Sequence, residues 1–396
     1  MRTWPLIFSA ALLANSVHAQ VPQPVDSAKL WHLRPEMRIG TAAGEKTSFN
    51  AIGDMAVSAD GTIFITQPSD GTIRKIAASG KPEDVTVIGG RGRGPGEFEA
   101  PYDIGVDGDT VWVTDRSLDR VTFLSREGRY LSSELFRRKV LRNTYLTGPP
   151  QFVLGDHSAL LVARPLPLKI KSVDRMPILR VTREGTILDT VTWLMGGHPR
   201  LTVQVNGRHA VSLPQPFDAV TIWAPDHHGD GIVLVDRTPA TDQRHASFVV
   251  RRLDADGKSV YSSRIRYRPM PLTASDRDGM VVRLLARSHV PAKEASSALK
   301  QRVLQKMWVP DFYPPVMDCI LGEKGFVWLR LKDRPGPKSH WVVIDNNGHL
   351  AAQLSGPRSL RIYRADAEHV WASELARLRV PVVVRFRIQK PSQNGT

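Results

Sequence analysis

Short apolar runs separated by turns rich in Asp and Gly recur along the chain at intervals of tens of residues. Within each run, β-branched or aromatic residues alternate with other residue types, which is typical of a half-buried strand. Residues 106–128 show the whole pattern: an Asp-Gly turn, a strand, a second turn, a second strand and a Glu-Gly pair. Recurrence at this period indicates a repeat architecture.

Six copies align on the strand that follows the first turn. These strands are expected at 61–66, 109–115, 158–163, 231–236, 325–330 and 368–373. The partner strands are expected at 72–80, 120–128, 177–185, 248–257, 340–348 and 381–388. All partners except the sixth end in a Ser-Gly, Glu-Gly, Asp-Gly or Asn-Gly pair, which suits a tight hairpin that needs positive φ.

The spacing of the copies predicts the architecture. Successive anchors are 48, 49, 72, 95 and 43 residues apart, counted between Ile63, Val111, Leu160, Ile232, Val327 and Val370. Three spacings fit one four-stranded sheet per repeat, and two carry insertions. The pattern therefore predicts an all-β fold, a six-bladed β-propeller. A parallel β-helix would need shorter and more uniform coils, and a sandwich would not explain six matching copies.

The ends of the chain predict how the ring closes. The sixth copy runs out after three strands, while the segment from Met37 to Gly40 offers an unpaired strand ahead of the first copy. We expect that strand to form the outer edge of the sixth blade, which removes an exposed sheet edge. The expected organisation is an N-terminal segment 20–45 with the closing strand, a propeller 46–390 and a tail 391–396.

The longest insertion, about 275–308, has a different pattern. It predicts two helices, 275–289 and 291–308, with Pro291 in a first turn. An apolar stripe recurs every four residues at Ala295, Leu299, Val303 and Met307. We favour a cap packed over one face of the fifth blade; the alternative is a lid or a docking hairpin for a partner.

The N-terminus indicates export. Arg2, the apolar run from Leu6 to Val17 and the small-residue pattern ending at Ala19 predict a secretory signal peptide, residues 1–19, cut between Ala19 and Gln20. No later stretch is long and apolar enough to form a transmembrane segment. We therefore expect a periplasmic or secreted protein. Its single cysteine, Cys319, excludes an internal disulfide and is interpreted as a buried, inert thiol.

The chain is basic, with 54 Lys and Arg against 39 Asp and Glu and a formal net charge of +15. Such a charge can indicate nucleic acid, an acidic polysaccharide or an anionic membrane surface as partner. Export argues against nucleic acid. The arginines are scattered, with only short pairs such as Arg251-Arg252. A generally basic surface is therefore favoured over a focused patch for anionic envelope polymers.

A glycine-rich run provides a family resemblance. Gly92 to Phe98 (GRGPGEF), followed by Pro101, resembles NHL-type propeller repeats and, more closely, exported bacterial six-bladed β-propeller proteins. The resemblance extends weakly over the mature chain, through Pro216-Phe217 and 313–315. It implies a propeller that is usually a binding scaffold, with some relatives being lyases or hydrolases that hold a metal in the channel.

The same run has two physical interpretations. Its glycines and proline permit sharp turns, and Phe98 would fill the gap between two blades. Flanking Arg91 and Arg93 could instead form a phosphate cradle, but the run leads into a strand and not into a helix N-terminus. A structural turn is therefore favoured. Arg91, Arg93 and Tyr102 stay ligand-binding candidates at the channel mouth.

Aligning the copies also brings out four aspartates at the start of innermost strands. They are Asp54, Asp103, Asp218 and Asp318, with Phe152 and Leu360 at the corresponding positions of blades three and six. Innermost strands line the channel, so these carboxylates could ring one mouth and bind Ca²⁺, which prefers several oxygen ligands. Alternatively, each Asp accepts backbone N–H bonds from the adjoining turn, and this structural role is favoured.

Other candidate chemistry is sparse. His227-His228 falls in a turn, and no zinc-type Cys pair, G-x-S-x-G or nucleotide fingerprint occurs in the right context. No catalytic residue can be assigned. We therefore predict an exported scaffold that binds a protein, peptide or carbohydrate ligand through loops around the channel. The alternatives are a metal-dependent lactonase- or lyase-like enzyme at the channel mouth, and docking to anionic envelope polymers.

Overall fold

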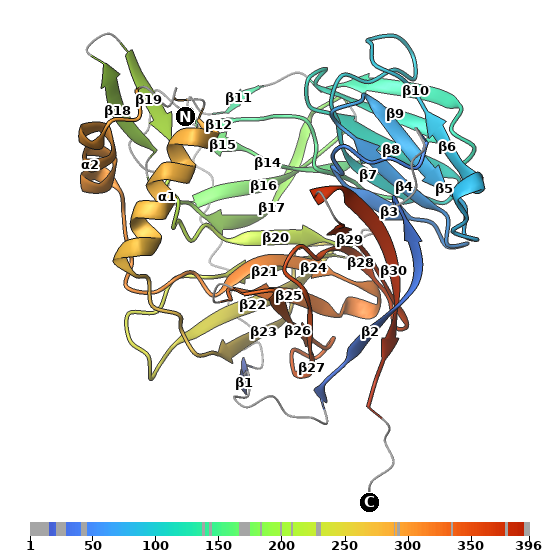
Figure 1. Ribbon diagram of the computed structural model, residues 1–396. Helices are drawn as coiled ribbons and strands as arrows, with labels where there is room; N and C mark the ends of the chain where they lie inside the picture. Colours follow the sequence, from blue (N-terminus) through green and yellow to red (C-terminus); the bar gives the residue numbers. More distant parts are fainter. Residues whose placement is uncertain are drawn as a thin grey trace, which may run out of the picture.

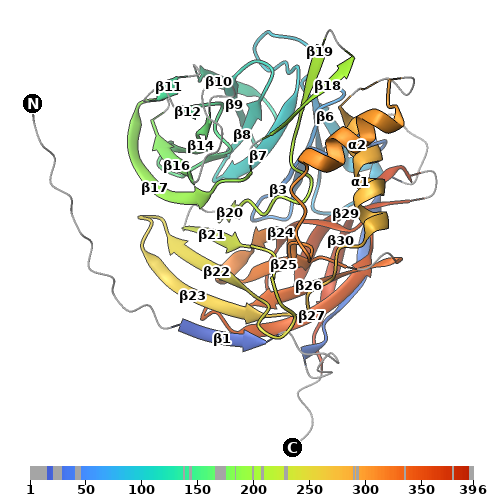
Figure 2. The ribbon, with the colours of Figure 1, turned by 90° about the vertical axis from the view of Figure 1, so that its left-hand side faces the viewer.

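The structure is a computed structural model. It describes residues 16–20, 29–40, 46–136, 139–141, 145–165, 175–182, 184–198, 200–206, 209–226, 231–288, 290, 294–333, 336–376 and 379–391. Figures 1 and 2 show sheets arranged in a ring around a central axis. The predicted all-β, six-bladed propeller is confirmed.

Each blade contains four antiparallel strands that follow one another from the channel outward, and the sheet of blade 4 has one further strand on its outer edge. Blades 1 and 2 contain β3 (Met55–Val57), β4 (Ile63–Gln67), β5 (Thr72–Ile76) and β6 (Val85–Ile88), then β7 (Pro101–Asp107), β8 (Thr110–Asp115), β9 (Arg120–Ser125) and β10 (Tyr130–Leu135). Blades 3 and 4 contain β13 (Phe152–Val153), β14 (Ala159–Val162), β16 (Arg175–Val181) and β17 (Ile187–Met195), then β20 (Ile222–Pro225), β21 (Gly231–Asp236), β22 (Ser247–Asp254) and β23 (Ser259–Arg266). Blades 5 and 6 contain β24 (Val316–Leu321), β25 (Val327–Leu331), β26 (Lys338–Ile344) and β27 (Leu350–Pro357), then β28 (Arg361–Ala365), β29 (His369–Leu375), β30 (Pro381–Gln389) and β2 (His32–Ile39).

The six aligned runs are the second strands of the blades, where the repeat is most apolar. Their side chains alternate between the two faces of a sheet, and each face packs against a neighbouring blade. In β8, Trp112 is 3% exposed and meets Phe152 of the next blade edge to face, with ring centroids 5.3 Å apart. The core is therefore a series of interblade layers around the ring.

The predicted closure is confirmed. Strand β2 pairs antiparallel with β30, with Met37 opposite Arg385 and Ile39 opposite Val383. The strand begins at His32, earlier than expected, and Gly40 lies just beyond it with φ +115°. A Cβ at Gly40 would lie 2.9 Å from the Pro381 carbonyl oxygen, so glycine is required there by both conformation and space.

The predicted signal peptide overlaps one more strand. Strand β1 (Ser16–Gln20) pairs in parallel with β23, from Ser16 opposite Ser262 to Gln20 opposite Arg266. The expected cleavage bond lies inside this strand, and its cleavage stays a prediction. In the part of the chain that the structure describes, no helix is long and apolar enough to span a membrane.

Two insertions form a lobe on one face of the ring. The hairpin of β18 (Leu201–Asn206) and β19 (His209–Leu213) lies between blades 3 and 4; α1 (Ala274–Arg287) and α2 (Ser297–Lys306) lie between blades 4 and 5. Both connect an outer strand to the next inner strand, and Figure 2 shows them on the face toward the viewer. A small sheet of β11 (Val140–Leu141), β12 (Tyr145–Leu146) and β15 (Arg164–Pro165) extends from blade 3.

The helices differ from expectation in extent and in packing. The Thr273 side chain accepts from the Asp276 backbone N–H in a capping box and starts α1, whereas Ser296 caps α2. The second helix is therefore shorter than 291–308, and Pro291 lies outside the described residues. The apolar stripe, including Leu299 and Val303, packs mainly on the β18–β19 hairpin and on α1, and not over a face of blade 5.

Candidate functional site

A cavity of about 350 Å³ lies between blades 4 and 5, and a second cavity of about 280 Å³ lies at the mouth of the central channel. The channel-mouth cavity is lined by residues from all six blades, which places it on the axis. Its lining includes Asp54, Asp103, Trp112, Arg116, Phe152, Trp223, Asp318, Arg361 and Tyr363. Three of the four predicted aspartates are therefore brought together.

The repeat itself positions the first two carboxylates. The backbone N–H of Asp54 donates to the Thr66 hydroxyl at 2.9 Å, and that of Asp103 donates to the Thr114 hydroxyl at 3.1 Å. Each threonine occupies the same place near the end of its blade's second strand, so the two aligned copies encode the same contact. The runs 61–66 and 109–115 contain Thr66 and Thr114, but the role of these threonines was not predicted.

The Asp54 carboxylate accepts few hydrogen bonds that would stabilise its negative charge. Its Oδ2 accepts only a long hydrogen bond, 3.4 Å, from the Ile104 backbone N–H, and a further backbone bond comes from Met55. Burial, together with the nearby charge of Asp103, raises the pKa of Asp54 to about 7. This carboxyl therefore changes charge near neutral pH.

Asp103 is more fully paired. Its two carboxylate oxygens accept hydrogen bonds from Arg116 at 3.1 and 3.2 Å, and Thr114 donates a third at 3.0 Å. Burial raises the pKa of Asp103, although the Arg116 charge opposes the shift. The Arg116 guanidinium also stacks on the Tyr102 ring at 3.6 Å, so Tyr102 supports the site from beside the cavity.

The positive charge of Arg361 interacts with carboxylates from two other blades, Asp54 of blade 1 and Asp318 of blade 5. Arg361 begins the inner strand of blade 6 and stacks over the Tyr363 ring at 4.7 Å. Burial acts to lower its pKa, but Tyr363 and the carboxylates of Asp54 and Asp318 outweigh burial and raise it. For Asp318, burial raises the pKa, and the positive charge of Arg361 opposes that increase. Arg116 and Arg361 were not predicted from the sequence.

Asp218 has a different role. Its carboxylate accepts from the His198 backbone N–H at 3.0 Å and from the Ala219 backbone N–H at 3.0 Å. It also contacts His198 Nδ1 at 3.0 Å, and the His198 ring stacks on Trp308 at 4.0 Å. Asp218 thus connects the base of the lobe to blade 4 and does not line the channel-mouth cavity.

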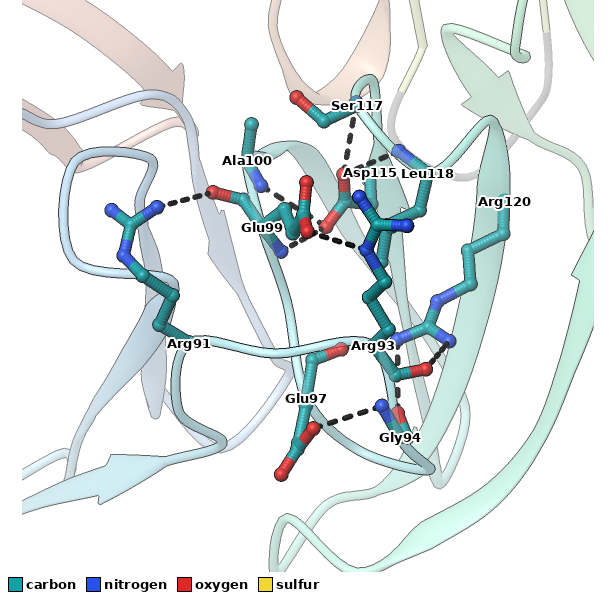
Figure 3. Close-up of polar contacts among 10 residues, drawn as sticks. All are labelled: Arg91, Arg93, Gly94, Glu97, Glu99, Ala100, Asp115, Ser117, Leu118 and Arg120. Carbon is teal, nitrogen blue, oxygen red and sulfur yellow. Dashed lines mark hydrogen bonds and ion pairs between the residues drawn. The ribbon is translucent and has the colours of Figure 1, made fainter.

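The glycine-rich loop is held by polar side chains of blade 2 (Figure 3). Asp115, fully buried, accepts four backbone N–H bonds at 2.7 to 3.1 Å, two of them from the loop residues Glu99 and Ala100. Arg120 donates to the carbonyl oxygens of Arg93 and Gly94 at 2.9 and 3.1 Å. These hydrogen bonds hold the loop as a turn between blades 1 and 2.

The two flanking arginines of this loop lie away from the cavity. Arg93 Nε donates to the Glu99 carboxylate at 2.7 Å, and Arg91 donates to the carbonyl oxygens of Glu99 and Ser69. Phe98 is fully buried between the blades, as the turn interpretation expects. Neither arginine is among the residues that line the channel mouth.

The described residues do not form the set of ligands that the Ca²⁺ hypothesis requires. Across the residues that the structure describes, no group of three or more His, Cys, Asp and Glu side chains is placed to hold a metal ion. Arg116 and Arg361 already supply positive charge beside Asp103 and Asp318. His227 and His228 lie outside the described residues. Cys319 is buried, as expected, and burial raises its pKa, which disfavours the reactive thiolate.

Comparison with solved structures supports the fold. No protein-family model and no curated protein matches the sequence. A member of the DUF4221 family from Bacteroides vulgatus aligns with a TM-score of 0.54 at 11% identity, over 92% of this chain and 100% of that chain. A Bacteroides fragilis protein, provisionally named an exported protein, aligns with a TM-score of 0.50 at 11% identity, over 95% of this chain and 100% of that chain. Both share the propeller fold, and identity this low extends the similarity no further than the fold.

Proposed function

We propose that this chain is an exported propeller with NHL-like repeats that serves as a binding scaffold, with its ligand held in the channel-mouth cavity. The observation that carries the proposal is the convergence of charged side chains from four blades on one cavity. Asp54, Asp103, Asp318 and Arg361 come from blades 1, 2, 5 and 6. Half-buried charged groups in a concave, preformed site are typical of ligand binding.

The chemistry of the lining favours a ligand rich in hydroxyl groups. Carboxylates accept hydrogen bonds and guanidinium groups donate them, so the cavity offers both partners that a hydroxyl needs. The indole and phenol rings of Trp112, Trp223 and Tyr363 add flat apolar surfaces beside these groups. Acidic and basic groups nearly balance, which disfavours a strongly charged ligand. A carbohydrate, or a hydroxyl-bearing segment of a glycosylated partner, fits this arrangement.

The test is a saccharide panel measured by saturation-transfer NMR and calorimetry. We expect at least one saccharide to bind, and Arg361→Met to weaken that binding at least tenfold because the guanidinium is lost. Arg361→Lys keeps the positive charge beside Asp54 and Asp318 but removes the planar fork, so it should fold and still bind more weakly. Arg93→Gln, outside the cavity, is the matched control. Equal affinity of wild type and both Arg361 variants would refute the proposal.

A second candidate function, catalysis in the same cavity, is favoured by the titration of Asp54. A carboxyl group with a pKa of about 7 can act as a general acid or base near neutral pH. A lactonase- or lyase-like reaction would use such a group. Turnover of a lactone panel that Asp54→Asn abolishes, with the fold intact, would support this candidate over binding alone.

A further inference from the structure

The cavity between blades 4 and 5 shares no lining residue with the channel mouth. On blade 5, Val342 pairs with Gln353 and His340 pairs with Ser355, so these four side chains lie on one face of the sheet. Val342 belongs to the core shared with blade 4, so this face is turned toward blade 4. Tyr267, just after β23, lines the opposite side.

The base of the lobe forms the roof of this interblade cavity. Met270 leads into the helices and Tyr313 leads out of them, and the Tyr313 backbone N–H donates to the Met270 carbonyl oxygen at 3.0 Å. Both side chains line the cavity and also contact the apolar core of the lobe. The insertion thus completes a preformed cavity at the ring's periphery.

The polar groups of the residues that line the cavity are mainly donors. Gln353 is 6% exposed, and its Nε2 has no hydrogen-bond partner among the described residues. Lys332 Nζ lies 4.1 Å from the centre of the Tyr313 ring, and burial lowers its pKa. Asp333 is the one carboxylate among the described lining residues, and both its oxygens contact His340, at 2.7 Å and 3.0 Å.

We propose that this interblade cavity is a second binding site, which takes a small amphipathic carboxylate. The apolar body would lie against Leu331, Val342 and Met270, and the carboxylate would face Lys332 and Gln353. A desolvated ammonium and an unpaired amide donor both gain from an incoming anion. A cationic ligand would instead be repelled by Lys332 and by nearby Arg268. The cavity volume of about 350 Å³ suits a small organic ligand.

The test uses octanoate as the probe, with octanol and octylammonium as comparators of equal chain length. Calorimetry should show octanoate binding at least tenfold tighter than either comparator. Lys332→Met keeps the side-chain stem on Tyr313 but removes the charge, so it should weaken octanoate binding at least tenfold. Gln353→Leu should weaken it severalfold. Arg361→Met, at the channel mouth, should leave it unchanged, which separates this site from the proposed function.

A further variant guards against misfolding. Ser355→Phe places a ring at an exposed position of the cavity rim, so it should block octanoate without disturbing the core. Thermal melting checks that each variant is folded. Binding of octanol or octylammonium as tight as that of octanoate would overturn the proposal, as would unchanged octanoate affinity in folded Lys332→Met.

Discussion

Asp54 illustrates how neighbours that are distant in sequence set the behaviour of one side chain. The repeat supplies its backbone contact with Thr66. Its pKa is raised by burial and by Asp103 of blade 2, and is lowered in part by Arg361 of blade 6. Only the closed ring brings these groups together. The raised pKa of this carboxyl is therefore a property of the assembled propeller, absent from the unfolded chain.

Stability should consequently depend on the charge of Asp54. Its pKa rises from 3.8 to about 7 on folding, so the folded state holds the proton more tightly than the unfolded state. Its contribution to stability is fully present below pH 4 and is lost as the pH rises from 4 to 7. Asp54→Asn, which cannot ionise, should gain stability relative to wild type over that window. The ceiling is about 4 kcal/mol, and screening by solvent reduces it.

Urea unfolding of wild type, Asp54→Asn and Asp60→Asn between pH 2 and pH 8 measures this effect. Asp60→Asn is a control of opposite sign. Hydrogen bonds from Ser58 and Thr62 lower the pKa of Asp60 to about 2, so its contribution is present above pH 4 and is lost as the pH falls toward 2. If the free energies of unfolding of wild type and Asp54→Asn run parallel between pH 4 and pH 7, the raised pKa of Asp54 is contradicted.

For single residues, the sequence predicted the positions of the site aspartates better than the residues with which they interact. Repeat alignment found Asp54, Asp103 and Asp318 because each blade places its inner strand alike. It misplaced Asp218, since β20 begins only at Ile222 and the insertion provides His198 as a partner for the carboxylate. Arg361 could not be found, because its partners lie on blades brought beside blade 6 only by closure of the ring.

At the scale of elements, two insertions depend on each other for an apolar core. The stripe on α2 predicted a helix, but a ten-residue helix is not stable alone in water. It needs the β18–β19 hairpin, where Leu201 and Val203 are buried. The hairpin was not predicted from the sequence, because it lies outside the period of the blades. The prediction that the helices pack over a face of blade 5 was therefore wrong.

This mutual dependence predicts local unfolding. Leu299 is fully buried between α2 and the hairpin, so Leu299→Ala should cost about 2–5 kcal/mol of lobe stability. Hydrogen exchange should increase in α1, α2 and the described hairpin residues, while strands of blade 6 keep their protection. Gln301→Ala, on the exposed side of α2, is the matched control. Equal loss of protection in blade 6 would show that lobe and ring unfold as one unit.

At the scale of the whole molecule, both ends of the chain build one blade. Strand β2 lies on the outer edge of blade 6, and its Met37 and Ile39 also enter the core of blade 1 beside Met55 and Ile65. Pro35 sits at an irregularity in the pairing, where its missing N–H is tolerated. The sequence predicted this closure because the sixth copy was one strand short. That count depends only on the period of the repeat.

Closure should therefore hold the ring together. A chain that begins at Lys46 lacks β2, so it leaves the backbone groups of β30 unpaired and exposes apolar side chains of blades 1 and 6. We expect a lower melting temperature and oligomers by size-exclusion chromatography. A chain that begins at Lys29 keeps β2 and is the matched control. A synthetic peptide of residues 29–40 should restore the monomer in trans, since the edge of β30 remains intact. If the Lys46 chain stays monomeric with unchanged melting, closure by β2 does not stabilise the ring.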